Sequence, residues 1–214
     1  MLHKNKLYDI DTLKSSFFYR ILEKSSERCK MESVFSKAFG FENRRSTWQK
    51  IYTQKVKDVK IIKLKEFNFK LLHNIVPCGK IISKWNKHIS ENCSICGECE
   101  TTKHMLFECK RVNNIWINVS LIINLPIQWK HIVTGMYNYE SESVKIKFYN
   151  YLVSMIVYAV FKENSHCKFG GLDYAKVNLK DVIEKNVIFY SNVLCYENEN
   201  SIMKSMFKRF VRMF

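Results

Sequence analysis

One short segment of this chain carries most of the residue types that could bind a metal ion. It reads Cys93-Ser-Ile-Cys96-Gly-Glu-Cys99 and continues through His104 to Cys109. A Cys-x2-Cys pair favours zinc, because its tight turn brings two sulfurs near one point, and tetrahedral Zn²⁺ then needs two further ligands. A histidine and another cysteine follow within seventeen residues of Cys93. The spacing therefore predicts one zinc site.

Two ligand sets compete for this site, since the segment has one cysteine too many. The first set contains Cys93, Cys96, His104 and Cys109. The second replaces Cys93 with Cys99 and has the C-x2-C-x4-H-x4-C spacing of the retroviral zinc knuckle. That knuckle resembles a glycine-rich loop, whereas Glu100 and Lys103 stand where small residues would let such a loop fold tightly. We favour the first set, which closes a wider loop, and expect Cys99 to be a spare or exchanging thiol.

The spacing between the last two ligands restricts the local structure. His104 and Cys109 are five residues apart, which on a straight helix means about 140° of rotation and about 7.5 Å of rise. If both bind zinc, the helix must break between them. We predict a short turn that starts near Thr101, an interruption by Cys109 and then a helix that contains Trp116. Three thiolates and one imidazole leave no open coordination position, so the zinc would be structural and would contribute to folding.

The elements that must position this site are expected to be helices. The chain has only 6 Gly and 2 Pro in 214 residues, too few turn residues for a sandwich or barrel. The fold class is therefore all-α, an irregular helical assembly with one small embedded Cys3His zinc site. Apolar periodicity predicts helices at about 47–56, 61–75, 142–163, 173–195 and 199–213, and a short one that ends near Trp85. We expect Leu64, Leu71 and Ile75 to face inward, and Trp85 to be part of the core.

We divide the chain into three segments. Residues 1–43 form a helical N-terminal extension with apolar periodicity around Leu13–Leu22. Residues 44–135 contain the basic helices and the zinc region, and residues 136–214 contain the C-terminal helices.

The longest apolar stretch, from Phe148 to Phe161, covers about two-thirds of a bilayer span and predicts a buried helix. The N-terminus lacks a signal-peptide core. We therefore expect an intracellular protein, in the nucleus, the cytoplasm or both, whose eight cysteines are metal ligands or free thiols.

Positive charge is concentrated in one part of the chain. The net charge is +15, and residues 44–87 alone hold twelve Lys or Arg against two acids, a net of +10. Such an excess fits a phosphate backbone, and it fits a solvated helix face equally well. Candidate phosphate contacts are Lys60, Lys63 and Lys70 on one helix stripe, with Lys103, Lys110 and Arg111 near the zinc ligands. Stacking of aromatic side chains such as Trp85 on unpaired bases is the alternative to a position in the core, and we favour the core.

Several motifs on both sides of the predicted zinc site follow one another in a fixed order. Trp48-x2-Ile51-Tyr52 comes first, and the run from Leu64 to Ile75 and the Cys93/Cys96 pair follow. Next come Glu100-Thr101-x2-His104, Cys109 and Trp116, then Leu125-Pro126-x2-Trp129 and Gly135. Over roughly residues 45–160 this order resembles the zinc-binding region near the C-terminus of reverse transcriptases from non-LTR (LINE-type) retrotransposons. The resemblance implies the first ligand set. It also implies a region beyond the polymerase thumb that helps to hold template RNA or target DNA.

Catalysis does not follow from this resemblance. Polymerases of this kind need clustered aspartates for two metal ions, and this chain has five Asp and no Tyr-x-Asp-Asp turn. We expect a detached C-terminal piece of a reverse-transcriptase polyprotein, without enzymatic activity or a membrane partner. The leading hypothesis is a zinc-stabilised accessory module that binds RNA, DNA or both. The alternative is a zinc-stapled structural or protein-interaction module that docks on a polymerase domain or another partner.

Overall fold

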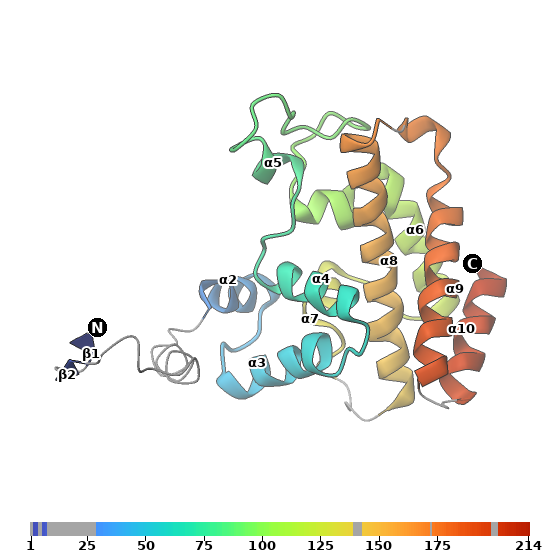
Figure 1. Cartoon of the computed structure of the whole chain (residues 1–214). Helices are drawn as coiled ribbons and strands as arrows, with labels where there is room; N and C mark the ends of the chain where they lie inside the picture. Colours follow the sequence, from blue (N-terminus) through green and yellow to red (C-terminus); the bar gives the residue numbers. More distant parts are fainter. Residues whose placement is uncertain (1, 4–5, 8–28, 139–142, 172, 198–200) are drawn as a thin grey trace. The chain divides into compact units, whose positions relative to one another are not determined.

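The structure is a computed structural model that describes residues 2–3, 6–7, 29–138, 143–171, 173–197 and 201–214. It divides into two compact units, Met1–Phe41 and Glu42–Phe214, which are treated separately below (Figure 1). The three-segment division made from the sequence stays a prediction. The apolar stretch around Leu13–Leu22 lies outside the described residues.

In the residues that the structure describes, the first unit contains one helix and a small strand pair. Strands β1 (Leu2–His3) and β2 (Lys6–Leu7) pair in antiparallel fashion, and helix α2 spans Lys30–Phe39. Gly40 ends α2 in the left-handed conformation at a φ of 69°, and its N–H donates to the carbonyl of Ser36. A glycine at this position caps the helix without steric cost.

In its described part the second unit contains helices joined by turns and loops and no strand, which confirms the all-α fold class. Its first half contains α3 (Arg45–Tyr52), the π-helical turn η2 (Thr53–Lys57), α4 (Ile62–Leu72), α5 (Gly79–Ile82) and the π-helical turn η3 (His104–Glu108). Its second half contains α6 (Lys110–Ile123), α7 (Trp129–Thr134), α8 (Val144–Phe169), the 3-10 turn η4 (Tyr174–Lys176), α9 (Leu179–Glu197) and α10 (Ser201–Met213).

Helix α8 is the centre of this unit. It packs against α4, α7, α9 and α10 and against both π-helical turns (Figure 1). It is also long and apolar enough to cross a membrane, but 72% of its most apolar window is buried within the protein. A helix that is apolar on all sides fits such a central position. The prediction of a buried helix at Phe148–Phe161 is confirmed.

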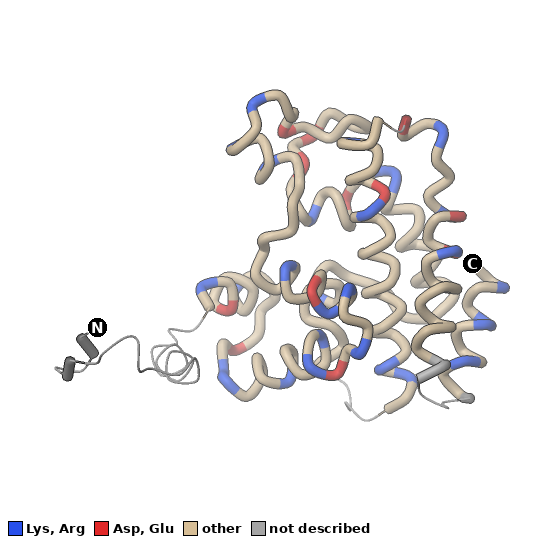
Figure 2. Tube along the Cα trace, in the orientation of Figure 1, with Lys and Arg blue, Asp and Glu red and all other residues tan. Residues whose placement is uncertain are grey.

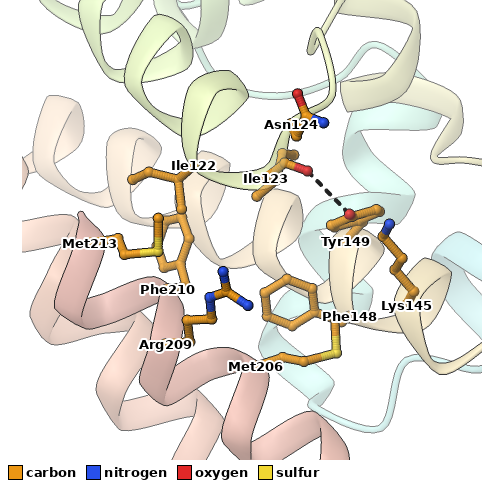
Figure 3. Close-up of a pocket in the computed structure, with 10 residues that line it drawn as sticks. All are labelled: Ile122, Ile123, Asn124, Lys145, Phe148, Tyr149, Met206, Arg209, Phe210 and Met213. Carbon is orange, nitrogen blue, oxygen red and sulfur yellow. Dashed lines mark hydrogen bonds between the residues drawn. The ribbon is translucent and has the colours of Figure 1, made fainter.

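Helix α10 docks with one face and exposes the other. Met203, Phe207 and Phe210 are buried, while Lys204 and Arg212 are exposed. Where α10 approaches α6 and the start of α8, the three helices border a cavity of about 270 Å³ (Figure 3). Most of the residues that line the cavity are apolar, and the charged ones among them are Lys145 and Arg209.

Two sequence predictions about the core are wrong. Leu64 and Leu71 face inward as expected, but Ile75 is 54% exposed. Helix α4 ends at Leu72 because Asn74 adopts a φ of +52° and Ile75 N donates to Lys70 O at 2.9 Å. This is the Schellman arrangement that ends a helix.

Trp85 is the second error. Its side chain is 79% exposed, because α5 already ends at Ile82 and the chain continues in turns. The apolar spacing around Ile81, Ile82 and Trp85 predicted a helix with one buried face. The helix that forms is too short to carry Trp85 into the core.

Lys55 in η2 is a fully buried cation. Its Nζ donates to Ser154 Oγ at 3.4 Å, and within the described residues no carboxylate forms an ion pair with it. Burial removes the ammonium group from water and lowers the pKa of Lys55 to about 7.

Lys55→Met should therefore stabilise the protein at pH 7, by roughly 1–4 kcal/mol, because an apolar side chain of similar length replaces a poorly solvated amine. Ser154 Oγ keeps its bonds to Asn150 O and Asn68 Nδ2.

In the unfolded chain the lysine has its ordinary pKa of 10.5 and binds more protons than the folded chain between about pH 7 and 10.5. Wild-type stability thus rises with pH over this range, and the advantage of methionine fades. Urea unfolding under reducing conditions at pH 7 and pH 10 measures the free energy of unfolding of the variant and the wild type. An equal difference between the two proteins at both pH values would contradict the prediction.

Candidate metal centre

Four side chains of the zinc segment converge on one point. The ligand atoms of Cys93, Cys96, His104 and Cys109 all lie within 4.8 Å of one another. Cys93 Sγ and Cys109 Sγ are 3.8 Å apart, and Cys96 Sγ lies 3.2 Å from His104 Nε2. Two sulfurs that bind one tetrahedral zinc at ~2.3 Å are separated by ~3.8 Å. The donor set thus fits one zinc ion, while Cys99 is exposed and outside the group.

The first two ligands lie on a tight hairpin. Asn92 and Cys99 form an isolated antiparallel bridge, and Cys93 N donates to Glu98 O at 2.7 Å. Between them Gly97 has a φ of +78°, and its N–H donates to Cys93 O at 2.9 Å. A residue with a Cβ would be strained in this left-handed conformation. The glycine after Cys96 therefore lets the chain turn back immediately after the two sulfurs.

The last two ligands lie on either side of the predicted helix break. The short helical segment starts at Thr101, whose Oγ1 accepts from His104 N at 3.0 Å. A π-helical turn follows, closed by a hydrogen bond from Cys109 N to His104 O at 2.8 Å. Cys109 itself is extended, with a ψ of 136°, and its carbonyl starts α6 by accepting from Val112 N. The predicted break is confirmed, and the wide turn brings both side chains to the same point.

Trp116 holds this turn against the following helix. Its indole Nε1 donates to the carbonyl of Leu106 at 2.8 Å, and its side chain is buried. The carbonyls of a π-helical turn next to a helix break need such external partners. Trp116 is therefore a support of the metal-binding turn and not only a core residue.

Glu98 orients the histidine. Its Oε2 lies 3.2 Å from Nδ1 of His104, while the opposite ring nitrogen, Nε2, faces Cys96. A carboxylate that accepts from one imidazole nitrogen fixes the ring and leaves the other nitrogen as a metal ligand. Sequence reasoning missed this role of Glu98.

A second buried carboxylate attaches the zinc hairpin to the rest of the unit. Glu100 Oε1 accepts from Lys168 Nζ and from Gly79 N, each at 2.7 Å. Glu100 is 1% exposed, and the Lys168 side chain is 7% exposed. A Cβ on Gly79 would lie 2.8 Å from Lys168 Nζ and 2.9 Å from Ser90 O. One carboxylate thus joins the start of α5, the zinc hairpin and the end of α8.

The pKa values of the two buried thiols in the metal-binding group, Cys93 and Cys109, shift in opposite directions. Burial raises the pKa of Cys93, but hydrogen bonds from the Ile95 backbone and from His104 outweigh this, and the net pKa is lowered. Burial raises the pKa of Cys109 to about 12, and the adjacent charge of Cys93 adds to the effect. Zinc binds thiolates, so metal binding must displace the proton from Cys109.

The basic residues predicted to contact nucleic acid are on the surface, but they differ in their partners. Lys60, Lys63, Lys70 and Lys110 are exposed. Lys103 forms an ion pair with Glu108 at 2.6 Å. Arg111 is half-buried, donates to Val177 O at 3.2 Å and lies 5.3 Å from the ring centroid of Tyr174. Contact of these six residues with nucleic acid stays a prediction.

Residues 29–116 match the family model described as zinc-binding in reverse transcriptase. The match contains all four residues of the Cys3His group and ends at Trp116. It starts earlier and stops earlier than the resemblance over 45–160 inferred from the motifs. No curated protein and no solved structure matches the chain.

We predict one zinc ion per purified chain, which Cys93→Ser removes and Cys99→Ser retains. Cys93 belongs to the converging group, whereas the Cys99 thiol is exposed outside it. Zinc should also be lost on acidification, since protons compete for the thiolates. Elemental analysis of the wild type and both variants measures this. Loss of zinc in Cys99→Ser and not in Cys93→Ser would establish the knuckle ligand set instead.

We also predict that Lys168→Met lowers the free energy of unfolding by about 3–5 kcal/mol, because Glu100 is then left as a buried charge without its cation. The double variant Glu100→Gln/Lys168→Met should recover part of this loss, since glutamine still accepts from Gly79 N. Lys162→Met is the control, as Lys162 is an exposed lysine of the same helix. Denaturant unfolding of the zinc-loaded proteins provides the comparison. A cost for Lys168→Met no larger than that for Lys162→Met would contradict the role of the pair.

Proposed function

We propose, on the premise that residues 29–116 belong to the reverse-transcriptase zinc-binding family, that this chain binds RNA or DNA as an accessory module. The family's domain is a zinc-binding accessory, not the catalytic domain. The bound zinc is structural, because four protein ligands leave no position for a substrate or a reacting water. Within this proposal the protein comes from a non-LTR retrotransposon and holds template RNA or target DNA.

The observation that carries the proposal is the exposed positive charge on residues 44–87, where Arg44 is paired with Glu42. Lys55 is buried, but ten of the twelve cations in this range are exposed. In the part of the chain that the structure describes, neither Lys63 nor Lys70 forms an ion pair. Figure 2 shows basic positions along both α3 and α4. Such cations release counterions when they meet phosphates, which drives binding without reading sequence.

The zinc centre contributes indirectly to this function. It fixes the hairpin at residues 92–99, the segment before His104 that contains Lys103, and the start of α6, where Lys110 lies; both lysines are exposed. Because Glu100 ties the hairpin to α8, the ion also limits movement of the basic loop between α5 and the zinc ligands. Loss of zinc would then weaken nucleic-acid binding through misplacement of cations and not through removal of a direct contact.

The second candidate function, docking on a polymerase domain, is favoured by the cavity of α6, α8 and α10. Its lining of Ile, Met and Phe side chains suits an apolar anchor, and Lys145 and Arg209 suit neighbouring acidic groups (Figure 3). The occupant of this site would be an acidic polypeptide segment with one large apolar side chain. This site is lined by residues of α6, α8 and α10, whereas Lys63 and Lys70 belong to α4, so the two functions can be tested with different variants.

We predict that the zinc-loaded chain binds RNA or DNA with an affinity that falls steeply as salt rises. Lys63→Glu/Lys70→Glu should weaken binding to all sequences and reduce the slope of log K against log salt by about 0.7–0.9 for each phosphate that the variant no longer neutralises. Filter binding or anisotropy at several salt concentrations measures both quantities. Absence of any salt-dependent association with RNA, single-stranded DNA or duplex DNA would refute the proposed function.

Lys162→Glu/Lys185→Glu is the matched control, because these exposed lysines of α8 and α9 give the same change in net charge. It should keep the wild-type salt slope. Lys145→Glu/Arg209→Glu tests docking on a polymerase domain separately from nucleic-acid binding. If this pair abolishes capture of a purified polymerase domain while Lys63→Glu/Lys70→Glu leaves it intact, the cavity is the partner site.

A further inference from the structure

We propose that Trp85 is a stacking platform for an unpaired base, so that the turn after α5 holds single-stranded nucleic acid. This inference rests on the proposed function and adds to it the kind of nucleic acid and a contact residue. Among the described residues, Trp85 is the most exposed large apolar side chain, at 79%. Trp48 and Trp116 are each 2% exposed, and Trp129 is only partly exposed. An indole left almost fully in water offers both ring faces to a planar ligand.

The charge around Trp85 suits a phosphate backbone on both sides of a stacked base. Lys80 and Lys84 precede the ring, Lys87 follows it, and all three are exposed. The sequence contains no acidic residue between Glu66 and Glu91. Proteins that bind single strands combine such cations with aromatic rings, because every base has a face that can stack.

The turn that carries Trp85 is held in place at both ends by Glu100, the residue that follows the zinc hairpin. At its start, Gly79 N donates to the Glu100 carboxylate and Lys80 N donates to Glu100 O at 3.1 Å. At its end, Glu100 N donates to Glu91 O at 2.8 Å. Loop 79–91 therefore begins and ends on Glu100, next to the metal ligands.

Within the loop, further hydrogen bonds set the course of the backbone at the ring. Trp85 N and Asn86 N both donate to Ile82 O at 2.9 Å, and Ile89 N donates to Asn86 O at 3.1 Å. The Asn86 side chain accepts from His88 N at 3.0 Å. A loop ordered in this way loses little conformational entropy when a base stacks on the ring.

Unpaired bases fit this site better than a duplex or a protein. In a duplex the bases stack on one another and offer no free face in its interior, whereas a single strand can present one. A protein partner would normally cover an apolar patch, but the residues next to Trp85 in sequence, Lys84, Asn86 and Lys87, are polar or charged and exposed, while the isoleucines of the loop are partly buried. The combination of one exposed ring with three exposed lysines favours a polyanion with planar groups.

The test uses tryptophan fluorescence of the zinc-loaded full chain. Oligo(U), oligo(dT) and a blunt DNA duplex are titrated against wild type, Trp85→Ala and Trp85→Phe. Single strands should quench the wild-type emission and protect it from iodide, while the duplex should not. Trp85→Ala should lose roughly 5- to 100-fold in single-strand affinity, measured by anisotropy, with an unchanged salt slope, and Trp85→Phe should recover most of it. Leu121→Ala, which removes another highly exposed apolar side chain, is the control and should bind as wild type.

The outcomes separate this inference from the proposed function. If Trp85→Ala binds single strands with wild-type affinity and the wild type shows salt-dependent binding, stacking is wrong and the proposed function stands. If the wild type binds no nucleic acid, both fail. If an acidic polypeptide such as poly-glutamate quenches Trp85 emission and the oligonucleotides do not, the loop is a protein-binding site and the inference is overturned. Zinc content and circular dichroism establish that each variant is folded.

Discussion

The buried carboxylate of Glu100 is the contact on which the arrangement of the metal centre depends. It accepts from the backbone at the start of α5 and from Lys168 near the end of α8, while its own backbone pairs with Glu91 and Lys80. The zinc ion would tie together residues 93–109 only, and this carboxylate connects them to the rest of the unit. Because a charge buried this deeply is tolerated only with its cation and its hydrogen bonds, these segments have one favourable arrangement. The metal supplies local order, and the ion pair converts it into a fixed position within the fold.

The same arrangement explains how a closed metal site can serve binding. Four protein ligands prevent the ion from acting on a substrate, so its contribution is geometric. Exposed lysines lie in loop 79–91, directly before the π-helical turn and at the first residue of α6, and neither the loop nor the turn is a long helix with its own stability. Short elements of this kind keep a surface in one conformation only when something strong ties their ends. Zinc and the Glu100–Lys168 pair do so here.

The features of the metal centre that could be predicted from the sequence are those that depend on the spacing of residues close together in the chain. The convergence of the Cys3His group follows from the Cys-x2-Cys turn and from the rule that residues five apart diverge on a helix, and the break at Cys109 followed from the same rule. Lys168 could not be predicted, because it pairs with a residue 68 positions earlier and nothing in its own neighbourhood marks it. Trp85 and Ile75 were misplaced because periodicity assumes that the helix continues, while the ends of α4 and α5 are set by backbone turns. Whether the surface lysines bind phosphates depends on a partner, which neither periodicity nor packing describes.

The π-helical turn between His104 and Cys109 makes the length of this segment unusually intolerant of evolutionary change. A π-helical turn is an α-helical turn with one residue added. Deletion of any one residue from Met105 to Glu108 would leave the histidine and cysteine four apart, so an uninterrupted helix would become possible. Every later position of α6 would then rotate by about 100° relative to the hairpin, and Trp116 would no longer reach the carbonyl of Leu106. Loop 79–91, whose ends meet at Glu100, can by contrast gain or lose residues at its tip without changing the register of any helix. Related chains should therefore vary in length before the first cysteine and keep a constant length between the histidine and the last one.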